Sequence, residues 1–99
     1  MKRAYELALV IRMDTGGDET INETISNVQA WVEADEQGQV TKIDRWGRRR
    51  LAYGIDNQRD GYYVILEARI EPAALQEVER NLKLTAGILR YLIVRADES

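Results

Sequence analysis

The spacing of hydrophobic positions changes several times along the chain, and each change marks a new secondary-structure element. From Ala4 to Ile11 every second residue is a large apolar one, which predicts a strand with one buried face. Segment 14–18 then supplies turn residues and a candidate helix N-cap. Apolar residues next recur every three or four positions, which predicts an amphipathic helix ending near Gly38. This helical stripe consists of Ile21, Ile25, Val28 and Val32.

The middle of the chain has the pattern of a β-hairpin. Residues 40–55 mix β-branched and aromatic side chains with charged ones, which is typical of an exposed edge strand. Gly47 interrupts this strand and is a candidate β-bulge. Residues 56–61 have the composition of a turn, and residues 62–70 alternate again as a strand. We therefore expect the two strands to pair as a hairpin.

A second helix and a last strand complete the pattern. Pro72 is favoured at the first position of a helix, and residues 85–87 close that helix. Residues 88–94 form the last predicted strand, and residues 97–99 form a frayed C-terminal end. The order strand, helix, strand, strand, helix, strand predicts one α+β domain over residues 1–96. Its four-stranded antiparallel sheet would carry both helices on one face.

Such an architecture leaves the other face of the sheet without a covering layer. The residues that alternate with the core positions would lie on that open face, and they are not uniformly polar. A partly apolar, uncovered sheet face is typical of a partner-binding surface. Its expected members are Ala8, Val10, Tyr63 and Ile65, with Glu67, Arg69 and Arg90 near them.

The composition argues against an enzyme. The 99 residues include neither histidine nor cysteine, which removes the commonest catalytic base, the thiolate nucleophile and most ligands of transition metals. Ser26 and Ser99 lie outside any nucleophile or phosphate-loop motif. No apolar run is long enough to span a bilayer, and the start of the chain is a poor signal peptide. We therefore expect a binding protein without catalytic residues, metal, cofactor, small-molecule substrate or membrane partner.

The net charge of −3 hides an uneven distribution of charge. Residues 13–41 carry acidic side chains and no lysine or arginine, whereas residues 42–50 carry five basic side chains against Asp44 alone. The local potential, and not the net charge, attracts a polyanion. An acidic protein can therefore present a basic patch here.

The segment from Trp46 to Ile55 places three consecutive arginines between an indole and a phenol. Arginine pairs with phosphate and stacks on bases, and aromatic rings offer further stacking surfaces, so the mixture favours an RNA partner. The same residues fit a solvated edge strand whose charges discourage edge-to-edge pairing. The residues alone leave both interpretations open.

Four stretches spread over the chain carry a family resemblance. They are residues 3–6 (Arg-Ala-Tyr-Glu), 49–53 (Arg-Arg-Leu-Ala-Tyr, followed by Ile55), 60–63 (Asp-Gly-Tyr-Tyr) and 88–94 (Ile-Leu-Arg-Tyr-Leu-Ile-Val). With them the sequence resembles the family of bacterial small-subunit ribosomal protein six over residues 2–95. This resemblance implies a ferredoxin-like βαββαβ fold and a structural role in the small ribosomal subunit, a ribonucleoprotein of translation. It also implies binding to the central domain of 16S rRNA as a heterodimer with ribosomal protein eighteen.

The resemblance also implies individual rRNA or partner contacts. Arg48 joins these candidates by its charge, although the family often has an apolar residue at that position. Tyr5 alternates in phase with Leu7 and Leu9, so core packing is at least as good an interpretation for it. The full candidate set is Lys2, Arg3, Tyr5, Arg48, Arg49, Arg50, Tyr53 and Arg90.

Two other classes of function share this topology. A metabolite-binding or regulatory ferredoxin-like domain would associate with itself through the open sheet face, but it has no need for consecutive arginines beside aromatic rings. A small acylphosphatase-like hydrolase would need a phosphate-cradling loop after the first strand, and Gly16-Gly17 alone is too weak a motif for one. The ribosomal reading places the protein in the bacterial cytoplasm, with an organellar ribosome left open.

Overall fold

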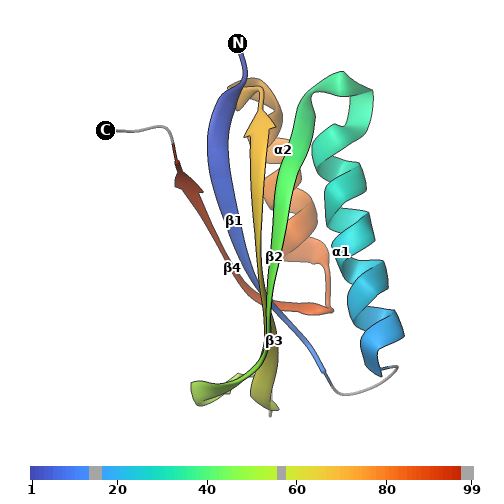
Figure 1. The fold of residues 1–99 in the computed structure, drawn as a ribbon, viewed down its shortest axis with the longest axis vertical. Helices are drawn as coiled ribbons and strands as arrows, with labels where there is room; N and C mark the ends of the chain where they lie inside the picture. Colours follow the sequence, from blue (N-terminus) through green and yellow to red (C-terminus); the bar gives the residue numbers. More distant parts are fainter. Residues whose placement is uncertain (14–16, 56–57, 97–99) are drawn as a thin grey trace.

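The computed structural model describes residues 1–13, 17–55 and 58–96 of the chain. Its strands form one antiparallel sheet in the order β2-β3-β1-β4, and both helices pack on the same face of that sheet (Figure 1). This arrangement confirms the predicted α+β architecture. The elements are β1 (Arg3–Ile11), α1 (Gly17–Glu33), a short 3-10 turn (Ala34–Glu36), β2 (Gly38–Ile55), β3 (Gln58–Ile70), α2 (Pro72–Leu84) and β4 (Ile88–Arg95).

The hydrophobic core lies between the sheet and the two helices. Strand alternation separates the two faces, so that Leu7 of β1 pairs with Leu66 of β3 and Ile93 of β4 on the helix side. The predicted stripe of α1 is buried against these strands, which confirms the helical periodicity. The largest fully buried side chains are Leu7, Leu9, Ile11, Ile21, Leu66, Ile70, Leu82, Val28, Val32, Val64 and Val78.

The helix ends follow local sequence chemistry. Pro72 opens α2, where a missing N–H leaves no hydrogen bond unmade, as predicted. Helix α1 begins at Gly17, so most of the candidate N-cap segment lies outside the described residues. Its α-helical part ends at Glu33, earlier than expected, and the 3-10 turn leads into β2. A Cβ at Gly38 would overlap the backbone oxygen of Val32, so the chain can enter β2 this closely only with glycine there.

The β2–β3 hairpin differs from its prediction in length. The register shifts between Arg45 and Gly47, and Gly47 has φ +86°, which confirms the predicted bulge. Strand β3 begins at Gln58, so the prediction of a turn over residues 56–61 was wrong for its last four residues; residues 56–57 lie outside the described part. Asp60 pairs with Arg50 in the ladder, because cross-strand pairing overrides the turn preference of its neighbours.

Candidate RNA and partner interface

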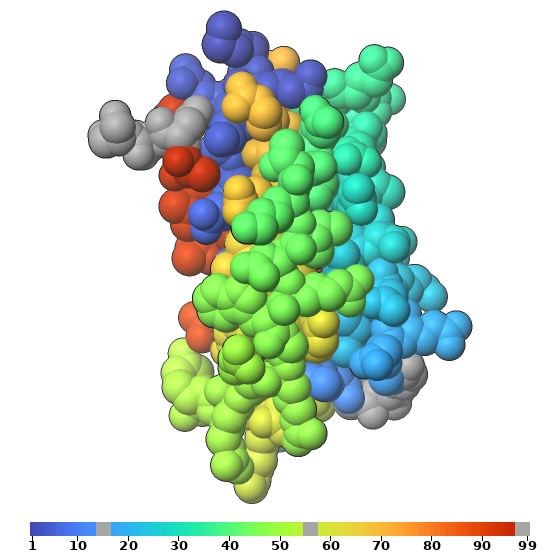
Figure 2. All heavy atoms as spheres, in the orientation of Figure 1, coloured from blue at the N-terminus to red at the C-terminus, as the bar shows by residue number. Residues whose placement is uncertain are grey.

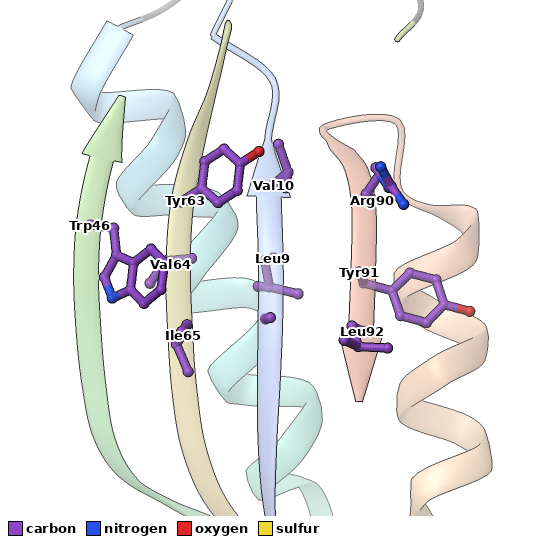
Figure 3. A pocket seen from close by; sticks show the side chains of 10 residues that line it. Leu9, Val10, Trp46, Tyr63, Val64, Ile65, Arg90, Tyr91 and Leu92 are labelled. Carbon is purple, nitrogen blue, oxygen red and sulfur yellow. The ribbon is translucent and has the colours of Figure 1, made fainter. Parts of the chain in front are cut away.

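The open face of the sheet carries two mainly apolar rows that cross all four strands. The strand registers place Tyr63, Val10 and Arg90 in one row, and Asp44, Ile65, Ala8 and Leu92 in the next. Trp46, at the bulge of β2, extends the first row (Figure 3). These side chains line a shallow hollow of about 340 Å³, which we call the sheet groove. The predicted open-face residues Ala8, Val10, Tyr63, Ile65 and Arg90 therefore all lie at this groove.

The walls of the sheet groove expose large apolar side chains. Ala8 forms the low centre, while Trp46 on one side is 47% exposed and Leu92 on the other is 60% exposed. The Trp46 indole nitrogen donates to Asp44 Oδ2 at 3.2 Å, so the polar edge of the ring is satisfied. Exposed aromatic and aliphatic groups around a hollow are typical of a protein-binding surface. Leu92 was missed in the sequence, although extending the alternation from Arg90 along β4 would have found it.

The neighbouring Tyr91 points away from the groove toward α2 (Figure 3). Its hydroxyl donates to Glu79 Oε2 at 3.0 Å. Burial raises the pKa of Tyr91, and the hydrogen bond to Glu79 and the charge of Glu79 raise it further. The phenol therefore stays protonated at neutral pH and ties β4, one wall of the groove, to the helix layer.

The three consecutive arginines of β2 have different surroundings. Arg48 Nη2 lies 2.8 Å from Asp60 Oδ2, so its charge is largely compensated. Arg49 donates from Nη1 to the Arg48 carbonyl at 3.3 Å and has no carboxylate partner among the described residues. Arg50 is exposed, with no ion pair to any residue that the structure describes. Two uncompensated guanidinium groups thus lie side by side on the ladder, and alternation directs them to opposite faces.

The end of the hairpin brings two further candidates together. Arg90 Nη1 donates to Tyr53 Oη at 3.4 Å, although 37 positions separate the two residues. Tyr53 is otherwise 65% exposed, so most of its ring remains available for stacking. The structure therefore gathers Arg49, Tyr53 and Arg90 at one end of the open face, beside the sheet groove.

The N-terminal candidates lie elsewhere. Arg3 pairs with Ile70 of β3, whereas Arg48 pairs with Tyr62, so eight residues of strand, or about 27 Å, separate the two sites. Lys2 is half-buried and Arg3 is exposed at that far end. Tyr5 is only 5% exposed and belongs to the core cluster. The structure contradicts a surface contact for Tyr5, because its ring packs in the core, as its phase with Leu7 indicates.

Fold and site together define a class of protein: a small α+β binding domain with a cationic hairpin next to an apolar groove. Within residues 1–13, 17–55 and 58–96, no group of three potential metal-ligating side chains lies close enough to hold an ion. Neither described helix has the length and apolarity needed to cross a membrane.

Comparison with known proteins identifies the family. The model of the family described as Ribosomal protein S6 matches residues 4–95, and this chain belongs to that family. The small ribosomal subunit protein bS6 of Moorella thermoacetica is 42% identical over 97% of this chain and 96% of its own length. The bS6 protein of Desulforudis audaxviator is 39% identical over 96% of this chain and 99% of its own.

A solved structure supports the same relationship. The 30S ribosomal protein S6 of Thermotoga maritima superimposes with a TM-score of 0.88 at 27% identity, covering 96% of this chain and 88% of that chain. The family consists of structural, non-enzymatic proteins of the small ribosomal subunit. The family resemblance, the ferredoxin-like fold and the absence of enzymatic activity are thereby confirmed.

Proposed function

We propose that this protein is a structural constituent of the bacterial small ribosomal subunit that binds the central domain of 16S rRNA together with ribosomal protein eighteen, and so supports translation in the cytoplasm. One observation carries this proposal: a cationic hairpin end lies next to an apolar groove. Arg49, on the open side of the sheet, and Arg50, on the other side of the same strand, mark the hairpin end, and the sheet groove lies beside it.

The hairpin end carries side chains that can bind RNA, and it projects far enough from the domain to contact it. Guanidinium groups donate in a planar fork to phosphate oxygens, and an exposed phenol can stack on an unpaired base. Arg49, Arg50 and Tyr53 supply these groups on a projection that extends beyond the helices (Figure 2). A projecting cationic ribbon can approach an RNA groove or loop.

The sheet groove fits a protein neighbour. Its hollow is lined mainly by apolar atoms, which favour aliphatic or aromatic side chains over phosphate. Carboxylates border it, because Asp44 lies in the second row and Glu6 is exposed in the next row without an ion pair to any described residue. A basic partner with an apolar anchor, as a small rRNA-binding protein would be, is complementary to this pattern.

Lys2 and Arg3 form a separate part of the proposed contact surface. Their distance from the hairpin, about 27 Å along β3, is too long for one phosphate group to reach both. We assign them to a second rRNA or partner contact at the opposite end of the sheet.

The decisive experiment reverses charge at the hairpin. The double variant R49E/R50E is expected to bind a central-domain rRNA fragment about a hundredfold more weakly, with ribosomal protein eighteen present at fixed salt. The matched control is R80E/K83E, which makes the same charge change on the exposed side of α2. Equal losses in both variants would mean a non-specific charge effect, and unchanged affinity of R49E/R50E would remove the hairpin from the site.

A second measurement tests the assembly. The chain should sediment with small ribosomal subunits and leave them at high salt, because phosphate contacts weaken as counterion concentration rises. A pool that never sediments with subunits would contradict the proposal.

A further inference from the structure

The open face is not open along its whole length. Val10 and Leu51 are each 8% exposed, although both lie outside the core between sheet and helices. Both side chains lie over the bare backbone of Gly61, where an added Cβ would overlap Val10 Cγ1 and come within 3.6 Å of Leu51 Cδ2. A second, small apolar cluster therefore forms on the face away from the helices, and the end of β2 covers it.

This end of the hairpin has little support from the sheet itself. Strand β1 pairs with β3 only as far as Ile11 and Tyr62, so residues 58–61 of β3, which face the end of β2, pair with β2 alone. A two-stranded ribbon alone is marginally stable in water. Arg49 and Arg50 lie on this ribbon, and their positions would vary widely without a further contact.

The further contact comes from the opposite side of the sheet. Two residues after Leu51, Tyr53 accepts a hydrogen bond from Arg90 of β4. The bulge at Gly47 interrupts the regular register, and β2 then curls across the sheet toward β4 (Figure 1). Leu51 and Tyr53 both lie between Arg50 and Ile55, where the ladder register shifts again, so the buried side chain and the hydrogen bond hold the same irregular segment.

We propose that Leu51, Tyr53 and Arg90 form a clasp that positions Arg49 and Arg50 for RNA before RNA arrives. The proposal rests on the proposed function of the hairpin. Arg90 is then a positioning residue and not a phosphate ligand, and preorganisation of the ribbon lowers the ordering cost of binding. Arg90 also lines the sheet groove, so the clasp connects the groove with the cationic ribbon.

The first test uses the protein without RNA. Y53F removes only the hydroxyl that accepts from Arg90, and amide hydrogen exchange at residues 49–51 should become about fivefold faster. The control is Y62F, which removes a hydroxyl on the helix side that has no hydrogen bond within the described part of the chain. L51A should accelerate the same amides more strongly, because it removes the buried anchor. Unchanged exchange in Y53F would overturn the clasp, whatever L51A does.

The second test separates positioning from phosphate binding. Y53F should weaken binding to the rRNA fragment about fivefold without changing the slope of log affinity against log salt, whereas R49A should reduce that slope by about one. R90Q removes the charge, and its shorter side chain does not reach the Tyr53 hydroxyl, so it should weaken binding about as much as Y53F does and leave the slope unchanged. A reduced slope in R90Q would overturn the positioning role, because it would make Arg90 a phosphate ligand.

The two hypotheses fail differently. If R49E/R50E has no effect on RNA binding while Y53F loosens the ribbon, the proposed function of the hairpin fails and the clasp stands as a feature of the free protein. If R49E/R50E abolishes binding while Y53F leaves the ribbon unchanged, the function stands and the clasp fails.

Discussion

The two faces of the sheet are built from the same strands but differ in what covers them. On β3, Leu66 lies under the helices with no exposed surface, while its neighbour Ile65 lines the sheet groove on the other side. The helix face is continuous and aliphatic, and its role is to hold the fold. The open face mixes aromatic, aliphatic and charged groups, and its small apolar cluster is covered only where the hairpin curls back. Alternation in one strand therefore separates stability from binding.

Truncating Leu66 and its neighbour Ile65 to alanine, one at a time, tests the difference between the two faces most directly. L66A should lower the free energy of unfolding by about 3 kcal/mol, because the cavity forms where helices and strands have packed around the side chain. I65A should lower it by only about 1 kcal/mol, since its side chain is already partly in water. Urea denaturation measures both.

The effects of the two variants on partner binding should have the reverse order, with I65A the more affected. I65A is expected to weaken the affinity for ribosomal protein eighteen about tenfold by removing an apolar wall of the groove. L66A, examined at a temperature where it remains folded, should bind nearly as the unsubstituted protein does. An equal decrease in the free energy of unfolding in the two variants would show that side chains of the open face stabilise the fold as much as core side chains do.

A second prediction concerns the point where the covered part of the open face begins. G61A should lower the free energy of unfolding by about 2 kcal/mol, because the added methyl group would overlap Val10 Cγ1. V10A removes the overlapping atom, so the G61A/V10A double variant should be less destabilised than the sum of the single variants by about 1 kcal/mol. A double-mutant cycle in urea gives this coupling, and strict additivity would mean that the two residues do not share the site.

Much of the fold follows from local patterns in the sequence. The alternation from Ala4 to Ile11 separates the two faces, and the stripe that includes Ile25 and Val28 fixes the buried side of α1. Gly47 identifies the bulge because a positive φ at a strand interruption favours glycine. These features depend on neighbours within a few positions, and such features are readable from one sequence.

The candidate site depended on contacts that sequence spacing does not contain. The ion pair of Arg48 with Asp60 forms because residues 58–61, predicted as part of a turn, continue the ladder of β3, and it gives one arginine of the run a different role from the other two. Tyr53 meets Arg90 only because β2 curls across the sheet. The strand alternation placed Tyr5 in the core, while the family resemblance alone pointed to the surface.

The two tryptophans give a third comparison between the faces. W46A should weaken the affinity for ribosomal protein eighteen about tenfold while changing the free energy of unfolding by less than about 1 kcal/mol, because half of its ring already faces water. W31A, on α1, should do the opposite, since Trp31 packs against the core cluster. Calorimetric titration and urea denaturation of both variants measure this contrast. A large decrease in the free energy of unfolding of W46A would show that the Trp46 indole stabilises the fold and does not serve only to bind a partner.

The smallest expected effects distinguish the arginines from one another. R48A should change the free energy of unfolding by less than about 1 kcal/mol, because the exposed pair with Asp60 is screened by solvent. It should also reduce the salt slope of rRNA binding by less than R50A does, and R50A should reduce it by about one. Equal slopes for R48A and R50A would show that Arg48 leaves Asp60 when RNA binds.

The variant D60N tests the charge of Arg48 by changing the other residue of its ion pair. Removing the carboxylate frees Arg48, so rRNA affinity should rise severalfold and the salt slope should steepen by up to about one. A salt titration of D60N beside D60N/R48A isolates the contribution of Arg48, because only the first variant retains the released guanidinium. If D60N binds as the unsubstituted protein does, Asp60 does not control the charge of this arginine. If affinity rises only while Arg48 is present, Asp60 sets how many of the three arginines meet phosphate.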